Sequence, residues 1–149
     1  MNCSVARTLE VVGEWWTMLI IREAFFGIRR FDEIQGRLGI ARNVLATRLQ
    51  SLVDNGVFER RLYQERPERF EYRLTEKGMD LYPVLVAMLG WGDRWAAGKD
   101  GPPLVLVHRT CGKPATPTLR CSECGEELRP HDVRPQPVPA RTSGAIPSD

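Results

Sequence analysis

The sequence predicts a mainly α-helical (α+β) fold with a small β-hairpin, followed by a small cysteine-rich β knuckle. Three observations lead to this fold class. Apolar residues recur at helical spacing from residue 5 to residue 53, with glycines at the breaks. Two strand-like segments follow, one on each side of a charged turn. Three of the four cysteines, Cys111, Cys121 and Cys124, lie within 14 residues, which favours a metal site over a disulfide framework.

Four helices are expected before the hairpin. Residues 5–26 form two of them, because the apolar face continues on both sides of Gly13. A short third helix is expected over Phe31–Leu38 and a fourth over Ala41–Val53, which ends at Asn55-Gly56.

The periodicity changes after the fourth helix. Val57–Tyr63 and Phe70–Leu74 have strand composition. Gln64–Arg69 between them is charged and contains a proline, so we expect a hairpin whose loop is too long for a tight turn.

The composition divides the chain into three parts. Residues 1–98 form the helical and hairpin domain, and residues 99–133 form the knuckle, with strands expected at Leu104–His108 and Leu128–Val133. Residues 134–149 are rich in proline, glycine and serine, and we expect this tail to be disordered.

Composition and charge narrow the function classes. The 149 residues are enough for one domain plus an appendage, and 42% hydrophobic and 27% charged residues are typical of a globular protein. The net charge is only +2, so a general polycation is excluded and any nucleic-acid surface depends on local arrangement. No apolar run reaches the roughly 18 residues of a membrane span, and Met1–Arg7 lacks a signal-type core. We expect a cytoplasmic protein without a membrane partner.

The order of elements is that of a winged helix-turn-helix. Phe31–Leu38 and Ala41–Val53 are then the two helices of the motif, and the second is the recognition helix. Its first turns reach base edges in the major groove, where Arg suits guanine and Asn suits adenine. The residues in these turns are Arg42, Asn43, Thr47 and Arg48.

The hairpin is the wing of this fold. Arg66 and Arg69 at its tip, with Arg60 and Arg61 at its base, are suited to clamp phosphates beside the groove. An ordinary solvated charged face is the alternative, because four glutamates of the same segment partly neutralise these arginines.

Five blocks of the chain resemble HxlR-type transcriptional regulators. They are residues 3–23 (CSVARTLEVVGEWWTMLIIRE), Arg30–Ile34, Val44–Leu49, Asn55–Arg60 and Tyr72–Gly78. The resemblance covers about residues 3–97 and implies a bacterial, homodimeric winged-helix protein on a palindromic DNA operator. Ser4 and Ala41 depart from the usual proline and serine of the family. The change at Ala41 removes a possible helix cap and phosphate donor, so the family's target sites do not carry over.

A long helix after the wing supports dimerisation. It is expected to be capped by Thr75 and to run to about Ala97, where Pro83 either kinks it or marks a first turn that starts later. The segment Leu81–Trp95 carries more large apolar groups than a small core absorbs. We expect it to pair with its mate across a two-fold axis; packing within one chain is the alternative.

Cys3 is a candidate redox-sensing thiol. It directly precedes the first helix, whose N-terminus, together with Arg7, favours a thiolate. The resemblance supports this role, since some members of the family sense oxidants or electrophiles with a cysteine at this place. The alternative is an inert thiol.

The knuckle repeats one pattern, His108-x2-Cys111-Gly112 and Cys121-x2-Cys124-Gly125. Two ligands followed by glycine can hold a cation from a tight turn, and two such pairs supply the one nitrogen and three sulfurs of a structural zinc site. We therefore expect Zn2+ on His108, Cys111, Cys121 and Cys124. The alternatives are His131 as the fourth ligand, or a metal-free knuckle with a disulfide formed on oxidation.

No enzyme is expected, because the chain lacks a phosphate loop, a G-x-S-x-G motif and a Cys/His pair outside the knuckle. We predict a sequence-specific DNA-binding regulator modulated by redox state or by a ligand. The effector could bind among Trp15, Trp16, Trp91 and Trp95, although such clusters also form plain core. The alternative function is a zinc- or thiol-based sensor in which the knuckle is the switch.

Overall fold

The computed structural model describes residues 3–138. These residues divide into two compact units between Val105 and Leu106, slightly later in the chain than the boundary expected at residue 98. Most of the predicted disordered tail, residues 139–149, lies outside the described residues. Among residues 3–138, no helix has both the length and the apolar character that a bilayer crossing requires.

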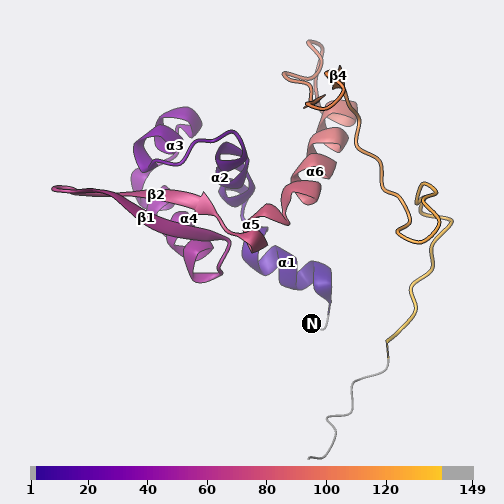
Figure 1. Cartoon of the computed structure of the whole chain (residues 1–149), viewed down its shortest axis with the longest axis horizontal. Coiled ribbons are helices and arrows are strands. Elements are labelled where there is room, and N and C mark those ends of the chain that lie inside the picture. The colour runs from indigo at the N-terminus through magenta and orange to yellow at the C-terminus, as the bar shows by residue number, and fades with distance from the viewer. Residues whose placement is uncertain (1–2, 139–149) are drawn as a thin grey trace, which may run out of the picture. The chain divides into compact units, whose positions relative to one another are not determined.

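The first unit contains the helices and the wing (Figure 1). Its elements are α1 (Ser4–Val12), α2 (Trp15–Phe25), α3 (Phe31–Leu38), α4 (Arg42–Asp54), β1 (Phe58–Glu65), β2 (Glu68–Leu74), α5 (Glu76–Met79) and α6 (Tyr82–Trp95). Figure 1 shows the hairpin β1–β2 beside α3 and α4, with its tip projecting beyond them. The predicted winged helix-turn-helix is confirmed.

Glycines end two of the helices for different reasons. Gly13 ends α1, and its N–H donates to Leu9 O at 2.8 Å; a Cβ at this position would lie 2.4 Å from that oxygen. Gly39 ends α3 with a φ of 64°, in the left-handed region that favours glycine. This sharp turn allows α4 to start three residues later, at Arg42.

The core of the first unit surrounds α2. Ile20 and Ile21 of α2 are fully buried, and α2 contacts α3, α4 and β2. Most of the rest of the core comes from the inward faces of α3, α4 and the start of the wing, and α1 adds Val12. The buried residues from α3 to the wing include Ile34, Ile40, Leu45, Leu49, Leu52, Val57 and Phe58. The apolar stripe predicted along the fourth helix is therefore confirmed at its central positions.

The wing differs from the prediction at its tip. The strands pair from Phe58↔Leu74 to Glu65↔Glu68, with an irregularity between Leu62 and Gln64. Only Arg66 and Pro67 remain for the turn, so the expected long loop is wrong. The strands can extend through charged residues because a projecting ribbon exposes both of its faces to water. Side-chain polarity therefore could not show where the strand pairing ends.

The helix predicted from Thr75 to about Ala97 is divided in two. Thr75 caps the first piece as expected, since its Oγ1 accepts the N–H of Gly78 at 3.2 Å. Pro83 lies in the first turn of α6, where the missing N–H costs no hydrogen bond. Of the two alternatives for Pro83, the later helix start is the one observed.

The second unit contains little regular structure. Strand β3 (Val107–His108) pairs with β4 (Lys113–Pro114), and Arg120 forms an isolated bridge with Glu127. The expected strand at Leu104–His108 is thus limited to its last two residues, and no strand forms at Leu128–Val133. No side chain of residues 106–138 is buried, so these apolar residues lack the packing surface that stabilises a strand.

Candidate nucleic-acid interface

A buried carboxylate joins the two helices that support the recognition helix. The side chain of Glu23 in α2 is only 1% exposed and accepts hydrogen bonds from Arg22 and from Arg37 of α3. Burial acts to raise the pKa of Glu23, but the hydrogen bonds from Arg37 and Arg22 outweigh it and hold the pKa below its usual value. The ionised pair therefore ties α3 to α2.

The first turn of α4 presents polar side chains to solvent. Arg42, Asn43 and Thr47 are all exposed, and small Ala41 precedes them without a side-chain cap. The Arg42 guanidinium lies 4.8 Å from the centre of the Phe31 ring, which orients it. Such an exposed group remains available to a base edge in the major groove.

Thr47 and Arg48 also make contacts within the protein. Thr47 Oγ1 donates to Asn43 O at 2.9 Å. Arg48 is partly buried, and its Nη2 lies 3.1 Å from Glu14 Oε1 at the start of α2. The structure therefore groups Arg48 with Glu14, apart from the exposed Arg42.

The wing arginines differ in their partners: Arg61 and Arg73 at the base form ion pairs, whereas Arg60, also at the base, lies 4.2 Å from the centre of the Phe70 ring. At the base, Arg61 pairs with Glu59 at 2.5 Å, and Arg73 pairs with Glu71 at 2.9 Å. The hydrogen bond from Arg73 holds the pKa of Glu71 below its usual value. Three arginines of the wing form no ion pair within the described residues: Arg60, Arg66 and Arg69. The alternative that these arginines form an ordinary solvated charged face, neutralised by glutamates, thus fits Arg61 and Arg73 better than the arginines at the tip.

One hollow of about 480 Å³ connects the recognition helix to the wing. Arg42 of α4 and Arg69 of the wing both line it. Asp32 lines it too, and its Oδ1 lies 3.6 Å from Arg42 Nη1. That ion pair is strongly exposed and therefore weak. The start of α4 and the tip of the wing thus belong to one continuous surface.

Sequence reasoning missed two members of this surface, Arg30 and Tyr63. The Arg30 guanidinium lies 4.5 Å from the centre of the Tyr63 ring, and both residues line the hollow. Arg30 also pairs with Glu71 at 3.9 Å. No local spacing could have found this contact, because it joins the loop before α3 to strands that are far along the chain.

A second surface of the first unit is apolar. Val5 and Leu9 of α1, Trp15 of α2, and Met88 of α6 are exposed and line a hollow of about 540 Å³. Of α6, only Val86 is buried. The remaining large exposed side chains of α6 include Trp91 and Trp95. The excess of apolar groups predicted for this helix therefore lies on the outside of the single chain.

The four tryptophans do not form one cluster of core residues. Trp15 and Trp16 have ring centres 5.1 Å apart, and Trp16 packs against the core. Trp15, Trp91 and Trp95 are exposed. Three of the four rings predicted to line an effector pocket are thus open to solvent in the single chain.

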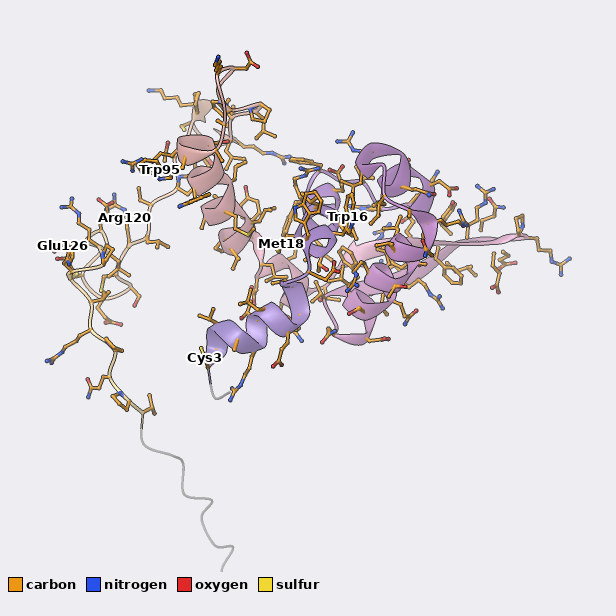
Figure 2. All side chains as sticks on the ribbon, turned by 180° about the vertical axis from the view of Figure 1, so that it is seen from behind. Cys3, Trp16, Met18, Trp95, Arg120 and Glu126 are labelled. Carbon is orange, nitrogen blue, oxygen red and sulfur yellow. The ribbon has the colours of Figure 1, made fainter. Side chains whose placement is uncertain are left out.

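Cys3 occupies the position before α1. Its backbone is extended, its carbonyl accepts the N–H of Arg7 at 3.0 Å, and its thiol is half-buried and free. Figure 2 shows Cys3 at the free end of α1. The thiol remains partly accessible to a small reagent.

The predicted zinc ligands lie in two pairs. Cys111 Sγ is 3.6 Å from His108 Nδ1. Hydrogen bonds from the backbone N–H groups of Cys124 and Glu123 and from the Cys124 thiol lower the pKa of the Cys121 thiol. Within residues 3–138, no three histidine, cysteine or acidic side chains lie close enough together to hold one metal ion.

Known proteins resemble the chain over both units. The sequence profile of the HxlR-like helix-turn-helix family matches residues 11–100. An uncharacterised HTH-type transcriptional regulator of Mycobacterium tuberculosis is 52% identical over 136 residues, which is 91% of this chain and 86% of the relative. That length exceeds the first unit, so the similarity extends into the second.

Solved structures agree with this assignment. The crystal structure of PA1607, described as a transcription factor, has a TM-score of 0.81 at 42% identity and covers 91% of this chain and 94% of its own. The redox regulator HypR in its reduced form has a TM-score of 0.58 at 31% identity, over 62% of this chain and 92% of HypR. The chain therefore belongs to the HxlR-like helix-turn-helix family of transcriptional regulators.

Proposed function

We propose that this chain regulates transcription as a homodimer that binds a palindromic DNA operator, with α4 in the major groove and the wing against the phosphates. The observation that carries the proposal is the shared hollow, which has exposed Arg42 of α4 and Arg69 of the wing on its border. A groove-reading helix and a phosphate-binding wing must face one duplex at the same time, and this surface meets that requirement. The proposal includes no enzymatic step.

The side chains divide into base readers and phosphate binders. Arg42 pairs bidentately with a guanine edge after it leaves its weak ion pair with Asp32. Asn43 is the adenine reader beside it. Arg66 and Arg69 have no internal partner to give up, so they bind phosphates and release counterions. Arg48 supports the start of α2 through Glu14 rather than reading a base.

The apolar surface on α1 and α6 supports the homodimer. A monomer seldom exposes a contiguous patch of large apolar side chains unless a partner covers it. A second copy is the partner of choice, because a two-fold axis places identical surfaces together and presents two copies of α4 to two half-sites about one DNA turn apart.

The experiment is operator selection from random duplexes, followed by binding measurements with variants. Arg42→Ala should weaken binding to the selected operator by roughly 1–3 kcal/mol and leave binding to unrelated DNA nearly unchanged. Arg129→Ala, an exposed arginine of the second unit, is the matched removal of one positive charge and should have little effect. Unchanged operator affinity in Arg42→Ala would show that α4 does not read the bases.

Thiol modulation through Cys3 is the second candidate function. It is supported by the half-buried free thiol before α1 and by similarity to HypR, a redox regulator. A peroxide would oxidise the thiolate to a sulfenic acid as the O–O bond breaks and hydroxide leaves. Because α1 contributes to the apolar surface, this polar product would alter the dimer and its operator affinity.

Two variants separate this candidate from a switch in the knuckle. With Cys3→Ser, peroxide should no longer change operator affinity, whereas a variant lacking the three cysteines of the second unit should respond like the wild type. The reverse result would assign the switch to the knuckle. Intact-mass measurement of each oxidised protein identifies the modified thiol.

A further inference from the structure

Two turns of the second unit share a hydrogen bond and a glycine at equivalent positions. The carbonyl of His108 accepts the N–H of Gly112 at 2.8 Å, and the carbonyl of Cys121 accepts the N–H of Gly125 at 2.9 Å. The two glycines have φ values of 67° and 75°, a region that favours glycine. Each turn therefore places its two candidate ligands at equivalent positions, although the intervening residues differ.

The first turn already has the spacing of two ligands on one ion. Zinc binds sulfur at about 2.3 Å and imidazole nitrogen at about 2.0–2.1 Å, so a tetrahedral angle separates the two ligand atoms by about 3.6 Å. Cys111 Sγ and His108 Nδ1 are 3.6 Å apart. The two ligand atoms therefore already have the separation that they would have in a tetrahedral zinc site. Nδ1 is the histidine nitrogen that would bind the metal.

The second turn is stabilised by hydrogen bonds to residues on either side of it. Cys121 N–H donates to Glu126 O at 2.8 Å, and Arg120 Nη1 donates to Gly125 O at 3.0 Å. Figure 2 labels Arg120 and Glu126 on this turn. Outer hydrogen bonds of this kind orient metal ligands.

No hydrophobic core accounts for these ordered turns. Among residues 106–138 no side chain is buried, and the described cysteines form no disulfide. A unit of this size, well below about 70–80 residues, usually needs a metal, a disulfide or a partner to stay folded. Four soft ligands in two matched turns fit a metal better than they fit solvent.

We propose that the second unit binds one zinc ion per chain through Nδ1 of His108 and the thiolates of Cys111, Cys121 and Cys124. Each thiol gives its proton to the solvent as its sulfur binds the metal. The two pairs are separate within residues 3–138, so binding must bring them together. Residues 115–119 have no secondary structure, which allows this segment to bend. The closed four-ligand set leaves no open position for catalysis.

Zinc binding is measured on the full-length reduced protein without DNA, by native mass spectrometry with added Zn2+ and by the visible spectrum with Co2+. We expect one metal per chain and a tetrahedral, thiolate-rich cobalt spectrum. Cys111→Ser and Cys121→Ser should each weaken the affinity at least 100-fold. Cys3→Ser is the matched control, because its thiol lies in the other unit, and it should bind metal as the wild type does.

The histidine is tested in the same way. His108→Ala should lose tight binding, and His131→Ala should retain it; the opposite result would overturn this ligand set. Absence of stoichiometric uptake by the wild type would overturn the site itself. Hydrogen exchange gives an independent readout, since zinc should slow exchange of the Gly112 and Gly125 amides and leave the exchange of α2 unchanged. None of these results depends on whether the protein binds DNA.

Discussion

Glu23 offers a direct test of how the recognition helix is supported. Its carboxylate is 1% exposed and accepts hydrogen bonds from Arg22 Nε at 3.1 Å, from Arg22 Nη2 at 2.6 Å, and from Arg37 Nε. Arg37 belongs to α3, so this contact holds the first helix of the motif against α2. Glu23→Gln nearly keeps the volume of the side chain, removes its charge and replaces one of the two accepting oxygens with an NH2 donor.

The size of the expected loss in folding stability depends on how exposed Arg22 and Arg37 are. A hydrogen bond to a charged group contributes about 1.5–3 kcal/mol, and Glu23 links two arginines. The arginine side chains are 37% and 52% exposed, so water replaces part of what they lose. We expect Glu23→Gln to lower the free energy of unfolding by about 1.5–3 kcal/mol at neutral pH, below the cost of stranding a fully buried charge.

The assay is urea unfolding of the wild type and the variant. Glu33→Gln is the matched control, because Glu33 is an exposed glutamate of α3 and its loss should change stability by less than about 0.5 kcal/mol. An effect of Glu23→Gln that is no larger than the control would refute the argument that this carboxylate joins the helices.

The pH dependence has a defined sign. The pKa of Glu23 is lowered in the folded protein, so its stabilisation is complete above the unfolded value of about 4.3 and disappears as the pH falls through the folded pKa. The stability difference between wild type and Glu23→Gln should therefore shrink in acid. A constant difference across that range would show that the charge is not the cause.

Three further predictions concern packing, assembly and DNA binding. Gly78→Ala should destabilise the fold by about 1–3 kcal/mol, because the new Cβ would lie 2.3 Å from Val57 O. Gly36→Ala has open space around its Cβ and should instead stabilise α3 by roughly 0.5–1 kcal/mol. Urea unfolding measures both changes. Met88→Glu on the exposed face of α6 should shift sedimentation toward the monomer, and an unchanged dimer would remove α6 from the interface. Arg66→Ala should weaken binding to all DNA sequences similarly and reduce the slope of log affinity against log salt by roughly one; loss confined to the operator would contradict a phosphate contact.

The helices were predictable because their signals are local. Apolar spacing of three and four residues requires one buried face whatever it packs against, and the observed α3, Phe31–Leu38, has the predicted bounds. Thr75 likewise caps a helix through a bond to Gly78, three residues away. The HxlR resemblance lay in short contiguous blocks over these helices and the ends of the wing strands, so family membership was also readable from the sequence.

The sequence by itself thus determined the order of the first four helices and the wing, the family, and the two matched His/Cys and Cys/Cys spacings. Only the tertiary structure decided which side chains meet. It placed Arg48 against Glu14, Arg42 on one hollow with Arg69, and both strands of the wing through charged residues. The physical reason for the first two is that these contacts join residues distant in the chain, so their geometry depends on how the elements pack around α2. The tip of the wing is a local pairing, but both faces of the ribbon are exposed there, so side-chain polarity does not reveal it.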